Sequence, residues 1–167
     1  MNGEILSNLQ PQAKMAAMRL LSAFPFLSLT SGRRCVDDQC RAMAVNEAHA
    51  RDWVAGTYRD SPVEEAVVAW LAANPTITDV PGLETGILGV LARFPPAALR
   101  SLSWHLSGEA FDVQPLTDER APAVTSFIRD LVTAQLSAGN SAKFLAIEAG
   151  LLRWHVQIAE PEPKEPT

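Results

Sequence analysis

The stretch that decides the fold is Ser103-Trp104-His105-Leu106-Ser107-Gly108-Glu109-Ala110-Phe111-Asp112. It places an imidazole, His105, and a carboxylate, Asp112, on either side of a glycine. Gly108 can take the positive φ of a tight turn, so these two side chains can face one point although they lie seven residues apart. A second imidazole follows at His155. Two His and one Asp can bind a zinc ion and leave a fourth position for water, which is the arrangement of a hydrolytic zinc site.

The composition is that of a globular domain. The chain has 167 residues, of which 47% are hydrophobic and 20% charged, so it can bury its own core. We expect a single domain over residues 1–159 with a helical insertion at about residues 59–100. A disordered tail is expected at residues 160–167, where Pro and Glu dominate. The net charge is −5 and no run of basic residues occurs, so nucleic acid is not an expected partner.

The amino-terminal segment, residues 1–26, lacks a cationic start followed by an unbroken apolar run. It therefore predicts neither a signal peptide nor a membrane span, and we expect a protein that is made and folded in the cytoplasm. Cys35 and Cys40 are five residues apart, which is the wrong spacing for a CxxC redox or zinc pair. Both are expected to be free thiols.

Hydrophobic periodicity predicts an α+β fold, with several helices flanking a small, mostly antiparallel sheet that carries the metal site. Helices are expected over residues 11–24, 36–58, 62–73, 83–94 and 122–136. Strands are expected over residues 26–30, twice within 102–115, and over 143–148 and 153–159. On the last strand, period-two alternation puts His155 on one face with Arg153 and Gln157. The same alternation turns Trp154, Val156 and Ile158 toward the core.

Three separated motifs resemble the D-Ala-D-Ala carboxypeptidase and dipeptidase family of zinc peptidases. That family includes phage endolysins and shares its fold with hedgehog signalling domains. Ser103–Asp112 matches the family's S-x-H-x-x-G-x-A-x-D block at every fixed position. Ser31–Arg34, followed by Gln39, resembles its S-G-aromatic-R…Q block, and Trp154–His155 resembles its terminal W-H. The resemblance extends over roughly Phe26 to Ile158.

The resemblance implies a zinc peptidase that cuts the peptide stem or cross-link of bacterial peptidoglycan, at a D,D- or L,D-type bond. It would act at the cell wall as a phage-derived lysin or as an enzyme carried in the virion. The implied Zn²⁺ ligands are His105, Asp112 and His155. Arg34 would contact the substrate carbonyl or carboxylate and stabilise the oxyanion. The implied substrate-binding residues are Ser31, Gln39 and Ser103, with Gln39 also supporting the Arg34 loop.

Two positions depart from the family pattern. Arg33 replaces the usual aromatic residue, which is a minor change. Leu152 stands three residues before His155, where the family has an acid that takes the proton from the attacking water. Glu148, seven residues before His155, is the nearest upstream acid and is either the catalytic replacement or a solvated carboxylate at a strand end. Glu109 is a poorer candidate, because its direction beside the turn is not defined by the pattern.

The leucine keeps a second interpretation open. The chain can be a catalytically weakened or inactive structural component of a phage particle, in the tail, baseplate or capsid. The predicted helical insertion would then offer a surface to other phage structural proteins. A cytoplasmic helical regulator is a third interpretation, but it leaves the three motifs unexplained.

Overall fold

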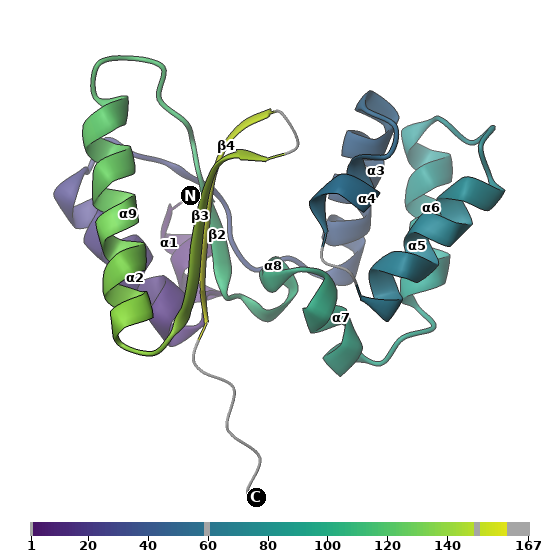
Figure 1. Cartoon of the computed structure of the whole chain (residues 1–167), viewed down its shortest axis with the longest axis horizontal. Coiled ribbons are helices and arrows are strands. Elements are labelled where there is room, and N and C mark those ends of the chain that lie inside the picture. Colours follow the sequence, from purple (N-terminus) through teal and green to yellow (C-terminus); the bar gives the residue numbers. More distant parts are fainter. Residues whose placement is uncertain (1, 59–60, 149–150, 160–167) are drawn as a thin grey trace, which may run out of the picture. The chain divides into compact units, whose positions relative to one another are not determined.

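The chain folds into a unit that contains a sheet and a unit built of helices (Figure 1). The computed structural model describes residues 2–58, 61–148 and 151–159. The sheet unit comprises Met1–Arg33 and Gly108–Thr167, and the helical unit comprises Arg34–Ser107. The combination of helices with a small antiparallel sheet confirms the expected α+β class. The helical unit contains the segment at 59–100 that was expected as an insertion.

The described strands of the sheet unit form one four-stranded sheet in the order β1-β2-β4-β3, and each neighbouring pair is antiparallel. The strands are β1 (Leu29–Ser31), β2 (Ala110–Val113), β3 (Ser141–Glu148) and β4 (Leu151–Ala159). The helices of this unit are α1 (Asn2–Ser7), α2 (Pro11–Ala23) and α9 (Ala121–Ser137). The strand expected at 26–30 therefore begins and ends later than predicted, and the predicted tail at 160–167 lies outside the described residues.

One face of the sheet builds the core of this unit. Its residues alternate along β2 and β4, as a period of two requires, and Figure 1 shows α2 and α9 on that side of the sheet. The fully buried members of this face include Phe111, Val113, Trp154, Val156 and Ile158. Each large apolar side chain buried in this way contributes roughly 1.5–3 kcal/mol relative to exposure. The opposite face is left for the polar side chains of β2 and β4.

A bulge in β1 lets one short strand serve both faces. Leu29 pairs with Val113 in the core row, whereas Ser31 pairs with Asp112, and the register shifts between Leu29 and Ser31. Without the shift, two residues two positions apart would point to the same face. With it, Leu29 is buried in the core while Ser31 joins the polar face.

A second bulge lies in β4, next to the last metal-ligand candidate. Leu145 of β3 pairs with His155 and Ile147 pairs with Leu152, so two steps along β3 correspond to three along β4. Such a bulge reverses the alternation on the longer strand. Leu152 and His155 therefore share one face, although regular alternation would separate residues three positions apart.

The helical unit has its own hydrophobic core. Its helices are α3 (Val36–His49), α4 (Trp53–Thr57), α5 (Pro62–Ala73), α6 (Val80–Leu91), α7 (Pro96–Leu102) and α8 (Trp104–Ser107). As predicted, Ser61 caps α5: its hydroxyl accepts the Glu64 backbone N–H at 3.1 Å. The prediction of a single helix over 36–58 is wrong. The chain turns at Asp52, whose φ is +68°, and a new helix, α4, begins at Trp53.

None of the helices among the described residues combines the length and the apolar character that crossing a bilayer requires.

Candidate metal centre

His105 lies in α8, a single helical turn, and not on the strand expected there. Ser103 starts this turn: its hydroxyl accepts the His105 backbone N–H at 3.4 Å and its carbonyl accepts that of Leu106 at 3.0 Å. The Ser107 hydroxyl donates back to the Trp104 carbonyl at 3.0 Å. These local bonds offer the backbone a helical alternative to strand pairing. The structure thus gives Ser103, expected to bind substrate, a role in holding His105.

Gly108 reverses the chain between His105 and Asp112. Its φ is +81°, as the sequence predicts for this turn. A Cβ atom at this position would lie 2.9 Å from the carbonyl oxygen of Asn8, closer than real Cβ contacts allow. The Gly108 carbonyl in turn accepts the backbone N–H of Gln10 at 2.9 Å. Only glycine combines this conformation with such close packing against the amino-terminal segment.

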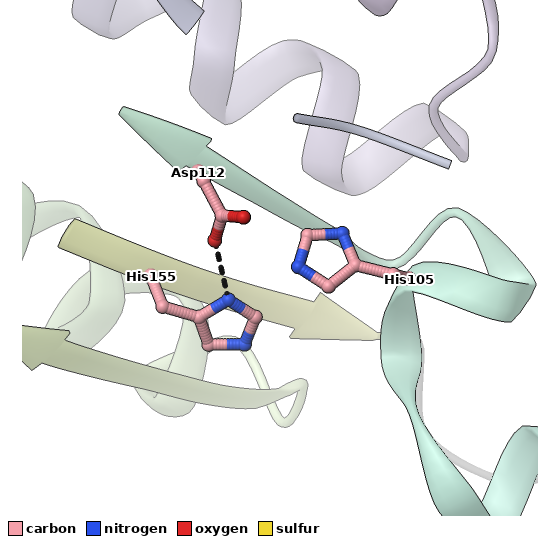
Figure 2. Close-up of side chains that lie close together, drawn as sticks. All are labelled: His105, Asp112 and His155. Atoms are coloured by element: carbon pink, nitrogen blue, oxygen red, sulfur yellow. Dashed lines mark hydrogen bonds and ion pairs between the residues drawn. The ribbon is translucent and has the colours of Figure 1, made fainter. Parts of the chain in front are cut away.

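Asp112 and His155 are cross-strand partners on β2 and β4. Oδ1 of Asp112 and Nδ1 of His155 are 2.7 Å apart (Figure 2). His155 and His105 are both buried, and Asp112 is half-buried. One ligand atom from each of the three side chains lies within 4.8 Å of the other two. Figure 2 shows His105 directing the ring nitrogen farther from its backbone toward the other two residues.

This donor set fits a metal ion. Two imidazoles and a carboxylate are the ligands of many three-residue zinc sites, and the same combination also binds iron. Burying these polar groups costs free energy unless they pair with one another or with an ion. Folding alone therefore does not favour bringing them together. The buried His105–Asp112–His155 cluster can hold a metal ion.

Among the residues expected to contact substrate, Ser31 and Arg34 are each linked to one residue of this cluster through the backbone. Ser31 is the cross-strand partner of Asp112, so it extends the row of Asp112 and His155 across β1. The Arg34 backbone N–H donates to the His105 carbonyl at 3.0 Å. The Arg34 side chain reaches Oε1 of Gln39 at 3.5 Å, which is a long contact.

Gln39 contacts the Arg34 side chain from a buried position. It is fully buried, and its amide nitrogen donates to the hydroxyl of Tyr58 at 2.7 Å. Gln39 thereby connects the Arg34 side chain to Tyr58, and its role in supporting the Arg34 loop stays a prediction. Its expected contact with substrate also stays a prediction.

Position 152, where the sequence motif leads us to expect an acid, holds a leucine. Leu152 is 51% exposed on the face that carries His155. The backbone of Glu148 pairs with Leu151, four residues before His155, which is about 13 Å along a strand. The Glu148 side chain lies outside the part of the chain that the structure describes. Glu109 accepts the Ile158 backbone N–H through its carbonyl and is half-buried.

Gln157 is the site residue that sequence reasoning missed. Its amide nitrogen lies 2.8 Å from Nε2 of His155, the ring nitrogen that does not face Asp112. The available signal was the period-two alternation that put Gln157 and His155 on one face. That pattern could not show that the two side chains would touch.

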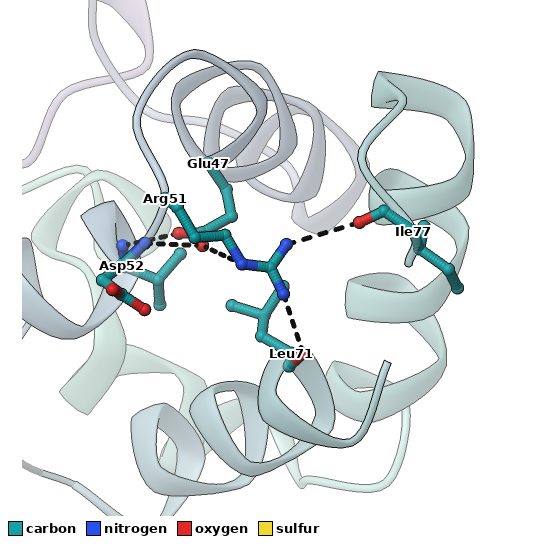
Figure 3. A network of polar contacts seen from close by, with 6 residues as sticks. Glu47, Arg51, Asp52, Leu71 and Ile77 are labelled. Carbon is teal, nitrogen blue, oxygen red and sulfur yellow. Dashed lines mark hydrogen bonds and ion pairs between the residues drawn. The ribbon is translucent and has the colours of Figure 1, made fainter. Parts of the chain in front are cut away.

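A second polar cluster lies in the helical unit and has a structural role (Figure 3). The carboxylate of Glu47, 2% exposed, accepts the backbone N–H groups of Asp52 and Val54 at 2.9 and 3.0 Å. It thereby satisfies the start of α4, where a helix leaves N–H groups without partners. Arg51, which follows α3, donates to the carbonyls of Leu71 and Ile77 at 2.9 and 3.3 Å. These bonds connect the segment after α3 to the last turn of α5 and to the loop before α6.

Comparison of this chain with protein-family models, curated proteins and solved structures finds no match.

Proposed function

We propose that this protein is a zinc-dependent peptidase of bacterial peptidoglycan with a hedgehog and D-Ala-D-Ala peptidase-like fold. The observation that carries the proposal is the meeting of His105, Asp112 and His155 in one buried cluster. They come from α8, β2 and β4, and the motifs single out the same three residues. Two of the three histidines of the chain are used in it.

The cluster would hold zinc through two imidazole nitrogens and one carboxylate oxygen. Bound in this way, zinc polarises a peptide carbonyl and brings the pKa of its water near neutrality. The protein's own part is to keep the ligands on short, tightly bonded elements. Ser103 and Gly108 do this for His105, and the β2–β4 pairing does it for Asp112 and His155.

Arg34 supplies the charge that would orient the substrate. Its backbone is bonded to the carbonyl of His105, so the guanidinium starts from a fixed point beside a ligand residue. A guanidinium pairs well with a carboxylate or with a carbonyl oxygen that gains negative charge during attack. A terminal D-Ala carboxylate or a stem-peptide carbonyl would satisfy it.

Leu152 limits how well such an enzyme can work. A hydrocarbon side chain cannot take the proton of the attacking water or return it to the leaving amine. Loss of such a group commonly costs about 10²- to 10⁴-fold in rate. We therefore expect slow turnover, with water or a substrate group moving the proton.

The proposal is tested with zinc-loaded protein and purified peptidoglycan of several cross-link types. We expect new amino groups and shortened peptides, detected by amine labelling and mass spectrometry. Chelation and the His105→Ala or Arg34→Ala variants should abolish their release. His49→Ala, which changes an exposed histidine at the end of α3, should leave it intact. Metal-loaded protein that releases nothing from any wall type would refute the enzymatic proposal.

A second candidate is a metal-stabilised structural component of a phage particle, in contact with other phage structural proteins. It is favoured by the exposed Leu152 on the His155 face, where an enzyme of this family needs an acid. For this candidate, zinc raises the melting temperature but releases no peptides.

A further inference from the structure

The hydrogen bonds around His155 define which ring nitrogen carries the proton. A carboxylate only accepts hydrogen bonds, so the 2.7 Å contact of Asp112 with Nδ1 requires a proton on Nδ1. In the neutral ring Nε2 is then an acceptor. The group that faces Nε2 at 2.8 Å is the amide nitrogen of Gln157, which is a donor. The two contacts thus agree on one tautomer.

A metal ion in the cluster needs the other tautomer. Nδ1 of His155 is the ring nitrogen that faces Asp112, while Nε2 is already in contact with Gln157. A nitrogen that binds a metal has no proton, so Nε2 must then carry the proton and become a donor. Two ligands of one tetrahedral zinc stand roughly 3.3 Å apart, so the 2.7 Å hydrogen bond and the metal exclude each other.

We infer that Gln157 is a positioning residue that keeps Nδ1 of His155 turned toward Asp112 and His105 in both tautomers. Its amide nitrogen donates to Nε2 in one, and its amide oxygen accepts from Nε2–H in the other after a half-turn of the amide. This inference rests on the proposed metal site. Among common side chains of this length, an amide is the one that both donates and accepts without a charge.

The backbone around Gln157 makes it suited to this role. It lies in the interior strand β4, paired with Ala110 of β2 and with Lys143 of β3. It is two residues from His155 on the same face, and its side chain is half-buried. Groups that hold a ligand's other ring nitrogen usually change metal affinity by about 10- to 100-fold when removed.

The test measures zinc and cobalt(II) affinity by competition with a chelator, together with ¹⁵N NMR of the histidine rings. In zinc-loaded wild-type protein we expect metal on Nδ1 of His155 and a proton on Nε2. Gln157→Leu should lose about 10- to 100-fold in affinity. Gln157→Glu, which keeps an acceptor for Nε2–H, should recover most of that loss. Gln12→Leu, at a half-buried glutamine on α2, is the matched control and should bind like wild type.

The possible results separate this inference from the proposed function. Unchanged affinity in Gln157→Leu, or metal on Nε2 of His155, overturns the role of Gln157 and leaves the metal site standing. Wild-type protein that binds no zinc or cobalt overturns both. Metal binding that depends on Gln157 without peptide release supports the inference and refutes the enzyme. If Gln157→Leu does not fold, the ring assignment in wild-type protein and the affinity of Gln157→Glu decide the matter.

Discussion

Asp112 and His155 face each other across neighbouring strands, with 2.7 Å between Oδ1 and Nδ1. The same two atoms are the ones that a bound cation would share. A metal ion there would take the place of the proton on Nδ1, and the neutral ring would then carry its proton on Nε2.

The first prediction concerns metal and stability. Zinc at about 100 times its dissociation constant should stabilise the folded protein by about 2.7 kcal/mol, because only the folded chain brings the three ligands together. His105→Ala and His155→Ala should lose both the bound zinc and this shift. Metal analysis and thermal unfolding with and without chelator measure the two effects. Equal zinc content in these variants and in His49→Ala would show that the ligands are elsewhere.

The second prediction concerns Leu152. Leu152→Glu should raise peptide release by about 10²- to 10⁴-fold, because it puts a proton acceptor on the face of His155. Leu136→Glu adds the same charge at an exposed leucine of α9 and should change nothing. Initial rates of amine release from peptidoglycan measure the effect. Equal rates in both variants would mean that position 152 does not face the reacting water.

The third prediction concerns Gly108. Gly108→Ala should destabilise the fold by about 1–3 kcal/mol, because alanine disfavours positive φ and its Cβ would meet the Asn8 carbonyl. Gly89→Ala, at an exposed helical site with open space around it, should stabilise by about 0.4–1 kcal/mol. Urea unfolding measures both. The same sign in both variants would contradict the role assigned to the turn.

The fourth prediction concerns the buried carboxylate of the helical unit. Glu47→Gln should cost about 1–3 kcal/mol, because one of the two backbone N–H groups at the start of α4 then faces an amide donor. Glu119→Gln removes a charge from an exposed loop residue and should be neutral within about 0.5 kcal/mol. A loss of similar size in both would point to net charge as the cause.

The fifth prediction concerns the two thiols. Burial, aided by Asp37, raises the pKa of Cys40 from 9.0 to about 12. Between these values the unfolded chain loses this proton while the folded chain keeps it, so this contribution to stability is lost as pH rises. Cys40→Ala should flatten that loss in urea titrations. A thiol reagent should label only exposed Cys35 in the native protein and both residues in urea. Native labelling of Cys40 would contradict the burial.

The sequence was informative wherever a simple period or a cap controls the backbone. Alternation alone separates Trp154 from His155, and Ser61 marks the start of α5, because both depend on geometry within a few residues. The break at Asp52 could not be predicted in this way, since it depends on the Glu47 carboxylate, which accepts the backbone N–H groups at the start of α4.

The site was predictable in its chemistry and less so in its backbone. The types and order of His105, Asp112 and His155 indicated the cluster without any knowledge of their distances. The helical turn of His105 was missed because four residues carry too little pattern to distinguish a turn of helix from a strand. Bulges such as the one that puts Leu152 on the same face as His155 cannot be read from hydrophobic spacing, since they arise from pairing with β3.

The bond from Gln10 to Gly108 links the first residues of the chain to the turn between two of the proposed metal ligands. A residue near the amino terminus holds the turn between ligands that lie about a hundred positions later in the sequence. Trimming or fusing the first ten residues would therefore loosen the centre without touching a ligand.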